Sequence, residues 1–449
     1  MNILLAAALL ALPLIPVRKA SADEAGWAKA AAAAARAAAL PGAFDGIRLP
    51  GGAPAPFPVP GFPAFRSSPP EEAAPAPAPP QGQSSAGIAF NGVELPRTAF
   101  TGQESVSRHL VRAIDASQGS VRLLLYDFSI QEVWDALERL LARAPSVKIQ
   151  VVLDQGHVFP RPGRRAKPII AKLLAETRIE TRVLSGLGDY GLMHNKIALF
   201  DGKVVKTGSF NWSSAAEKSN FENAVFSDEA ARVEVFSAYF DWVWSLAGPP
   251  DAPRPPPTPE GPPPADASPG VEFHSARFPV AVFSPQGGAV GRVLDAIRLS
   301  RDSIDVAMFS FTSKPLAEAL VERHAAGVRV RVVMDRKQSR SPHSVLAFLN
   351  ASGVPVFVMD GKTKSGVLHH KFAVFDGAMV EAGSYNWTAN GEYNSFENAA
   401  FLADPRDAAV FKAEFERLWS LAGAASTSLP GSASEEAGGF EGADSSNDR

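Results

Sequence analysis

His194-Asn195-Lys196 opens a stretch that occurs twice in this chain and decides its fold. It continues with Asp201, Gly208-Ser209-Phe210-Asn211-Trp212 and Glu222-Asn223. The same pattern returns 175 residues later, without a gap, as His369-His370-Lys371, Asp376, Gly383-Ser384-Tyr385-Asn386-Trp387 and Glu397-Asn398. A pattern kept twice in register indicates a duplicated unit. Its histidines, lysines, serines and amides favour a phosphate-handling active site to which each copy contributes half.

Strand-like and helix-like segments alternate within each copy. The first copy has apolar, strand-like runs at 121–126 and 147–153 around an amphipathic helix at 131–143. The second copy repeats this order at 303–311, 315–324 and 328–334. Strict alternation predicts the α/β class, with a mixed or parallel sheet flanked by helices in each of two tandem domains.

Composition divides the 449 residues into six predicted segments. The apolar run 3–17, followed by Ala20-Ser21-Ala22, predicts a signal peptide and hence an exported protein that is periplasmic, secreted or on the outer surface. An uncleaved anchor is the alternative. The segments are a signal peptide (1–22), an Ala/Pro-rich disordered spacer (23–95), a first domain (96–247), a Pro-rich linker (248–270), a second domain (271–422) and a disordered acidic tail (423–449).

The overall composition narrows the chemistry. Charged residues make up 20% of the chain and the formal net charge is -3, so no overall basic field indicates a nucleic-acid partner. Cysteine is absent, which excludes disulfides, thiolate metal sites and a thiol nucleophile. The sequence shows no metal-ligand cluster and no Gly-rich phosphate loop, so we predict neither a metal nor another cofactor.

A tight hairpin is predicted inside each motif. Asp201-Gly202 lies between two strand-like runs, which is a strong signal for a two-residue turn. This register places His194 opposite Ser209 and Lys196 opposite Thr207, on one face of the hairpin. Asp376-Gly377 builds the same turn and places His369 opposite Ser384. The two aspartates therefore have a structural explanation as turn formers, without a catalytic role.

The residue types match displacement at phosphorus. Histidine can attack phosphorus or protonate a leaving oxygen, whereas lysine and asparagine donate to the nonbridging oxygens. Glu222 and Glu397 each follow the histidine of their copy by 28 residues, and each can accept the second imidazole N–H. Because displacement needs a nucleophile and an acid on opposite sides, the two copies are expected to share one site.

Both copies fit the signature His-x-Lys-x4-Asp-x6-Gly-Ser-x-Asn, and the chain therefore resembles the phospholipase D superfamily over 96–247 and 271–422. The resemblance implies two α/β sandwich domains related by a pseudo-twofold axis, a site at their interface, and a phosphohistidine intermediate formed without metal. Asn-Phe-Glu-Asn-Ala (220–224) and Ser-Phe-Glu-Asn-Ala (395–399) look most like the endonuclease and cardiolipin-hydrolase branch, in which the glutamate contacts the histidine. That branch usually dimerises, whereas this chain resembles a fused pair and is expected to be a monomer.

Within the resemblance, one assignment of roles is preferred. His194 is expected to be the nucleophile and His369 the acid, while Ser209 and Ser384 support the clamp on the phosphoryl oxygens. That clamp consists of Lys196, Lys371, Asn211 and Asn386. The preferred substrate is a glycerophospholipid at a membrane surface, and nucleic acid cleaved by an endonuclease is the alternative.

Several other residues keep two interpretations. The aromatic residues Phe210, Trp212, Tyr385 and Trp387 either grip a substrate or belong to the core. The basic loop with Arg161, Arg164, Arg165 and Lys167, which is absent from the second copy, is either solvated or attracts phosphates. His157 and His343 have no counterpart in the repeat and are predicted to be ordinary surface or core histidines. His370 is predicted to face away from His369.

Overall fold

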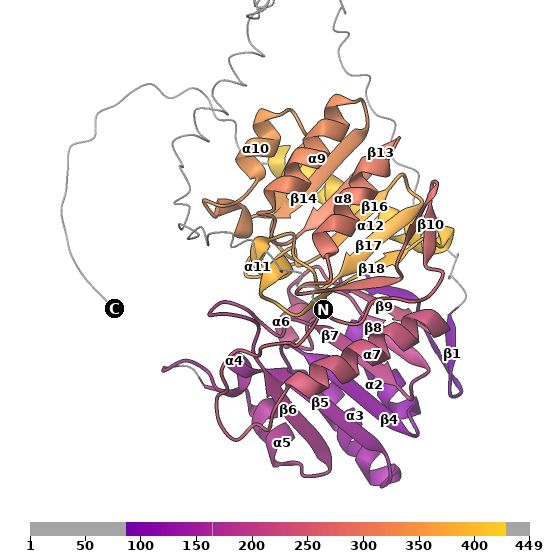
Figure 1. The fold of residues 1–449 in the computed structure, drawn as a ribbon, viewed down its shortest axis with the longest axis vertical. Helices are drawn as coiled ribbons and strands as arrows, with labels where there is room; N and C mark the ends of the chain where they lie inside the picture. Colours follow the sequence, from indigo (N-terminus) through magenta and orange to yellow (C-terminus); the bar gives the residue numbers. More distant parts are fainter. Residues whose placement is uncertain (1–86, 164, 428–449) are drawn as a thin grey trace, which may run out of the picture. The chain divides into compact units, whose positions relative to one another are not determined.

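The computed structural model describes residues 87–163 and 165–427 (Figure 1). Each copy of the motif belongs to its own sheet of seven strands. The first sheet has the order β3-β9-β8-β7-β4-β5-β6. Its strands are β3 (Thr98–Phe100), β4 (Ser120–Leu125), β5 (Lys148–Asp154), β6 (Ile179–Leu184), β7 (Lys196–Phe200), β8 (Val204–Thr207) and β9 (Asn223–Ser227).

The second sheet repeats this order as β12-β18-β17-β16-β13-β14-β15. Its strands are β12 (Ala281–Ser284), β13 (Ser303–Met308), β14 (Arg329–Asp335), β15 (Val356–Met359), β16 (Lys371–Phe375), β17 (Met379–Gly383) and β18 (Glu397–Leu402). In each sheet three strands are parallel (β4-β5-β6 and β13-β14-β15) and the other pairings are antiparallel. The prediction of two tandem α/β domains with mixed sheets is confirmed.

Helices flank both sheets. The first half has α2 (Val106–Ala116), α3 (Gln131–Arg143), α4 (Gln155–Val158), α5 (Pro168–Ala175), α6 (Ser214–Lys218) and α7 (Ala230–Leu246). The second half has α8 (Ala289–Leu299), α9 (Lys314–Ala325), the short 3-10 helix η1 (Gln338–Arg340), α10 (Leu346–Ala351), α11 (Ala389–Tyr393) and α12 (Pro405–Thr427). Helix α3 forms where it was predicted, because Val133, Leu137 and Leu140 recur at helical spacing and are buried together.

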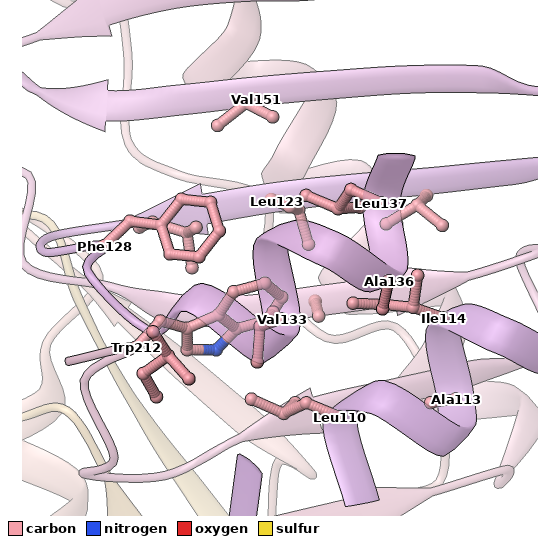
Figure 2. Packing of buried hydrophobic residues seen from close by; sticks show 14 of the residues in the cluster. Leu110, Ala113, Ile114, Leu123, Phe128, Val133, Ala136, Leu137, Val151 and Trp212 are labelled. Atoms are coloured by element: carbon pink, nitrogen blue, oxygen red, sulfur yellow. The ribbon is translucent and has the colours of Figure 1, made fainter. Parts of the chain in front are cut away.

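A hydrophobic core lies between the first sheet and helices α2 and α3. Leu110 and Ile114 from α2 meet Leu137 from α3, and these side chains pack toward Leu123 and Val151 of the sheet (Figure 2). Burial of such side chains stabilises the fold by about 1.5–3 kcal/mol each. The second half has its own core in the corresponding place.

The aromatic residues of the motif belong to these cores. Trp212 is 0% exposed and its ring meets Phe128 edge-on at 5.6 Å, and Trp387 meets Phe311 in the same way at 5.1 Å. Phe210 and Tyr385 are also buried. All four rings therefore hold the fold together, and the alternative that they grip a substrate is wrong.

Two further cores join the halves. Around α7, Phe236 and Tyr239 of the first half pack with Phe283 and Phe396 of the second. Around α12, Phe411 of the second half meets Phe100 of the first at 5.3 Å between ring centroids. The halves thus share buried apolar surface on both sides, which fixes the two copies of the motif against each other.

The hairpin inside each motif differs from the prediction by one residue. Phe200 pairs with Val204 and Phe375 with Met379, so three residues rather than two separate the strands. The left-handed backbone of Asp201 and Gly202 (φ 52° and 64°) closes the turn as expected, but one residue beyond it is left out of the ladder. Ser209 still reaches the site because Gly208, at φ 121°, redirects the chain just before it.

The ends of the predicted segments also need correction. Residues 88–95 were assigned to a disordered spacer, yet β1 (Ile88–Phe90) and β2 (Val93–Leu95) form a hairpin whose Phe90 and Leu95 enter the first core. The overlooked signal is Asn91-Gly92 between alternating apolar residues, which is typical of a type I′ turn.

A second hairpin, β10 (Val271–Phe273) with β11 (Ala276–Phe278), opens the second half. Helix α12 continues to Thr427, past residue 422, where a disordered tail was predicted. The predicted signal peptide, the spacer up to residue 86 and the tail from residue 428 lie outside the described residues.

Candidate active site

Backbone contacts between the halves bring the two motifs together. The segment that leads into His194 runs parallel to the segment that leads into Glu397, with a bridge between Met193 and Phe396. The amide of His194 donates to the carbonyl of Phe396 at 3.0 Å. The mirror contact joins Phe221 to Leu368, and there the amide of His369 donates to the carbonyl of Phe221 at 3.0 Å. Each histidine is therefore delivered to the glutamate of the other half.

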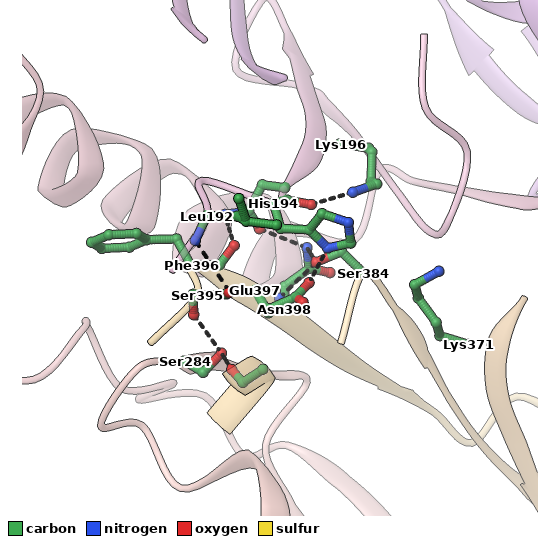
Figure 3. Close-up of polar contacts among 12 residues, drawn as sticks. Leu192, His194, Lys196, Ser284, Lys371, Ser384, Ser395, Phe396, Glu397 and Asn398 are labelled. Atoms are coloured by element: carbon green, nitrogen blue, oxygen red, sulfur yellow. Dashed lines mark hydrogen bonds and ion pairs between the residues drawn. The ribbon is translucent and has the colours of Figure 1, made fainter. Parts of the chain in front are cut away.

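The two histidine–glutamate pairs cross between the halves. Nδ1 of His194 lies 2.9 Å from Glu397, and Nδ1 of His369 lies 2.8 Å from Glu222 (Figure 3 shows the first pair). A glutamate–histidine contact was expected from the spacing of 28 residues within each copy, and in the structure each glutamate contacts the histidine of the other copy. Each bond occupies Nδ1 and leaves Nε2 as the nitrogen that can attack phosphorus or carry a proton.

The two lysines are buried between the halves. Lys196 and Lys371 are 0% exposed, and each ammonium donates to the carbonyl of the histidine two residues before it. Burial lowers the pKa of Lys371 to about 8, against the opposing effect of Glu222, and lowers that of Lys196 well below its usual range. An anionic phosphate beside these ammonium groups would restore their charge, so the site is suited to an anion.

Burial and the lysines also set the protonation of the pairs. The pKa of His369 falls to about 4 because burial disfavours the imidazolium, and Lys371 adds to this effect against Glu222. The pKa of His194 is lowered well below its ordinary value for the same reasons. Burial raises the pKa of Glu397 to about 7. In Glu222 burial also acts to raise the pKa, but the contacts with His369, Lys371 and Ser209 together outweigh it and lower the pKa. The two carboxylates of the site are thus electrostatically unequal.

The serines and asparagines of the motif surround the glutamates. The hydroxyl of Ser209 accepts the amide of Asn223 at 2.9 Å, and that of Ser384 accepts the amide of Asn398 at 3.1 Å. Hydrogen bonds from Ser209 and Ser384 help to lower the pKa of Glu222 and Glu397. Asn211 and Asn386 each carry a buried side-chain oxygen with no hydrogen-bond partner in the described part of the chain.

Asp201 and Asp376 lie in their turns and do not contact His194 or His369. Asp201 accepts the amides of Gln118, Gly119 and Ser120, and so anchors the start of β4. Asp376 accepts the amides of 301–303 before β13 in the same way. These contacts assign both aspartates a structural role.

Two pairs of residues at the site were not predicted from the sequence. The rings of Tyr126 and Phe309 lie 4.7 and 4.6 Å from the imidazoles of His194 and His369. Asp154 and Asp335 accept the amides of Met193 and Leu368, and so hold the segments that carry the histidines. For the aspartates a signal was visible in the sequence, because each directly follows a predicted strand in its copy.

The residues that follow His194 and His369 strengthen the interface. His370 points away from the groove, as expected, and its ring bonds to Asn223 and Glu414. At the corresponding position the side-chain oxygen of Asn195 accepts a hydrogen bond from the side-chain amide of Asn398 at 2.9 Å. In both halves the residue between histidine and lysine therefore contacts an asparagine of the other half.

A groove of about 560 Å³ exposes the chemistry to solvent. Both His194 and His369 line it, and they remain 7% and 6% exposed. Tyr126, Phe309 and Glu397 lie in its walls, together with residues of η1 and α11. His343, predicted to be an ordinary surface histidine, also lines this groove. Two imidazoles on one groove, backed by two lysines, can supply a nucleophile and an acid to a single phosphodiester.

Two features are absent from the described part of the chain. No group of three histidine, aspartate or glutamate side chains in this part of the chain could hold a metal ion. No helix within it is both long and apolar enough to cross a lipid bilayer.

Comparison with known proteins connects this geometry to a family. The family model "Cardiolipin synthase, PLD-like domain" matches residues 110–244 and 293–419, more than half of the chain. The mitochondrial cardiolipin hydrolase of Homo sapiens is 36% identical over 136 residues, which cover 30% of this chain and 53% of that protein. The corresponding protein of Xenopus laevis is 37% identical over 131 residues, 29% of this chain and 61% of that protein. The chain thus spans little more than half the length of these relatives.

A solved structure shares the fold over a longer range. The phosphatidylserine synthase of Haemophilus influenzae is similar over 73% of this chain and 86% of that chain, with a TM-score of 0.56 and 12% identity. The prediction of an exported protein is contradicted by the curated relatives, which are mitochondrial by name and not secreted. The apolar N-terminal run that motivated it lies outside the described residues.

Proposed function

The chain belongs to the phospholipase D superfamily, and from this premise we propose that it is a phosphodiester hydrolase that releases the headgroup alcohol of glycerophospholipids. The observation that carries the proposal is the crossed pair of histidine–glutamate contacts on one groove. The names of the curated relatives make cardiolipin the first lipid to test.

In the first proposed step, Nε2 of His194 attacks phosphorus and the bond from phosphorus to the headgroup oxygen breaks. His369 gives its proton to that oxygen, so the headgroup leaves as a neutral alcohol and the phosphatidyl group stays on His194. Lys196 and Lys371 face the phosphoryl oxygens from the buried side, and Asn211 and Asn386 complete this clamp. Stabilisation of the developing charge by such fixed donors contributes several kcal/mol, about 3–4 for a single donor.

In the second step His369 takes a proton from water, which attacks phosphorus and breaks the bond to His194. The products are phosphatidate and the free enzyme. Glu397 and Glu222 hold the two imidazoles in the tautomer that keeps Nε2 available. In the empty site the low pKa of His369 leaves it unprotonated at neutral pH. The negative phosphodiester favours the imidazolium, so the proton is acquired together with the substrate.

Because both halves of the site come from one chain, we propose a monomer with an intramolecular active site. Cross-half cores around α7 and α12 support this arrangement. Sedimentation of the active protein at the mass of one chain is the expected result.

The substrate class is tested by incubating the purified protein, in EDTA, with cardiolipin vesicles, phosphatidylcholine vesicles and single-stranded DNA in separate reactions. We expect phosphatidate-type products from at least one lipid and none from DNA. Cleavage of DNA alone would replace the lipid hydrolase by the metal-independent endonuclease.

A further inference from the structure

The two halves line the groove unequally, although the motifs that flank it are nearly identical. From the first half only Tyr126, Leu192 and His194 line it, whereas most of its wall comes from the second half. Corresponding positions explain the difference. Tyr126, Asp127 and His157 of the first half correspond to Phe309, Ser310 and Gln338 of the second.

In the first half these positions are joined to one another. Lys167, from the basic loop that the second half lacks, donates to Asp127 at 2.6 Å. The ring of His157 packs against Tyr126 at 4.6 Å, and its Nδ1 lies 3.8 Å from Asp127. Of this cluster only Tyr126 is among the described residues that line the groove, where its ring meets the imidazole of His194. The loop thus has a packing role through Lys167, while Arg161 and Arg165 remain exposed.

In the second half Ser310 and Gln338, at two of these positions, line the groove together with Thr312, and these three residues are here called the open end of the groove. No other described residue occupies their side-chain polar groups with a hydrogen bond. His343 lines this end as well. Among the described residues of the lining, Glu397 is the one carboxylate, and it is bonded to His194. Hydroxyl and amide groups that can both donate and accept therefore dominate the polar chemistry of the open end.

We infer that the end of the groove formed by Ser310, Thr312 and Gln338 is the subsite for the leaving headgroup, and that it takes an uncharged alcohol with further hydroxyl groups, such as a glycerol unit. This inference rests on the proposed hydrolysis of glycerophospholipids. A cationic headgroup lacks a partner there, because recognition of a quaternary ammonium requires carboxylates or open aromatic faces. The face of Phe309 already has the ammonium of Lys371 at 4.9 Å from its centroid.

The position of this subsite also bears on the roles of the histidines. In an in-line displacement the leaving group departs on the side opposite the nucleophile. A headgroup held at the open end, among residues of the second half, leaves beside His369 and opposite His194. The subsite thus supports His369 as the proton donor from geometry that the motifs themselves do not contain.

The first test needs no variant and compares three short-chain lipids: phosphatidylglycerol, phosphatidylethanol and phosphatidylcholine. Phosphatidylglycerol and phosphatidylethanol carry the same charge and differ in headgroup hydroxyls. We expect kcat/KM for phosphatidylglycerol to exceed that for phosphatidylethanol by about tenfold or more, the effect of one or two hydrogen bonds. Equal values for these two lipids would overturn the inference while the hydrolase remains. Hydrolysis of none of the three and of no cardiolipin, or of single-stranded DNA alone, would instead refute the proposed function.

The second test removes the polar groups of the open end. Ser310→Ala, Thr312→Val and Gln338→Leu should each lower the preference for phosphatidylglycerol over phosphatidylethanol by about fivefold. Turnover of a nitrophenyl phosphodiester, whose leaving group makes no such hydrogen bonds, should change less than about twofold. The matched control is Ser129→Ala, at the position of the first half that corresponds to Thr312, and it should leave the preference unchanged. The subsite would be contradicted if the variant that combines all three changes kept the full preference. An equal loss of kcat/KM for both lipids would contradict it as well.

Discussion

In the first half Tyr126 contacts His194 and the next residue, Asp127, is paired with Lys167, whereas in the second half Phe309 contacts His369 and is followed by Ser310. The pairs behind the histidines differ as well, since burial raises the pKa of Glu397 to about 7 while the pKa of Glu222 is lowered. The motifs are copies, but their surroundings are not. Duplication thus supplies two equal sets of reactive groups, and the surrounding residues can assign them different tasks.

The largest effect is expected from removing either histidine. His194→Ala and His369→Ala should each lower turnover of a phosphodiester by at least ~10³, because nucleophile and acid act as one unit. His324→Ala, which changes a histidine outside the groove lining, is the control and should stay within about twofold. Two independent sites would instead leave each single variant with half of the activity.

Smaller losses are expected at the crossed glutamates, and they should be unequal. At pH 7 Glu222→Gln removes a carboxylate whose lowered pKa keeps it charged, and kcat/KM should fall about 10²-fold. Glu397, with a pKa of about 7, is charged in only part of the molecules, so Glu397→Gln should cost about tenfold. A larger loss of kcat/KM in Glu397→Gln than in Glu222→Gln would contradict this difference between the halves.

The pKa of His369 predicts a pH-dependent stability. Its folded value of about 4 lies below the ordinary 6.5, so the unfolded chain binds this proton first as the pH falls. The free energy of unfolding should therefore decrease from pH 6.5 to pH 4 by up to about 3 kcal/mol from this group. Urea unfolding of the wild type and His369→Gln at both pH values measures it. If the free energy of unfolding decreases equally in the two proteins between pH 6.5 and pH 4, the pKa of His369 is not lowered in the fold.

The smallest effects concern a second pair of corresponding residues, Lys206 and Glu381. Buried Lys206 donates to the carbonyls of Lys196 and Phe210, so Lys206→Met should destabilise the protein by about 1–3 kcal/mol. Burial raises the pKa of Glu381 to about 8, so it is largely uncharged at pH 7. Glu381→Gln should then change the free energy of unfolding by less than about 0.5 kcal/mol. A strong destabilisation by Glu381→Gln would mean that the carboxylate is charged in the fold.

Much of this architecture could be predicted because it depends on local sequence patterns. The repeat gave the two domains, and helical spacing gave α3 with its observed bounds. The shared site followed from the chemical need for opposed groups. The hairpin at Asn91-Gly92 was equally local, but the surrounding Ala- and Pro-rich composition obscured it.

The exchange of glutamates could not be predicted from spacing. It depends on parallel bridges such as Met193 to Phe396, between segments about 200 residues apart, and neither segment carries a local signal for its partner. The register of the hairpin was wrong for a similar reason, because nothing in Asp201-Gly202 reveals the extra residue beyond the turn. The unequal surroundings of the two histidines include the contacts of Asp127 with Lys167 and of Tyr126 with His157, which only the folded chain displays.

The central claim, one shared site with divided roles, is tested most directly by locating the phosphoryl group on the quenched enzyme. A nitrophenyl phosphodiester needs little protonation of its leaving group, so His369→Ala should still form the covalent adduct and His194→Ala should not. Mass spectrometry after an alkaline quench should find one phosphoryl group per chain, on His194. Phosphate on His369, or two groups per chain, would contradict the account.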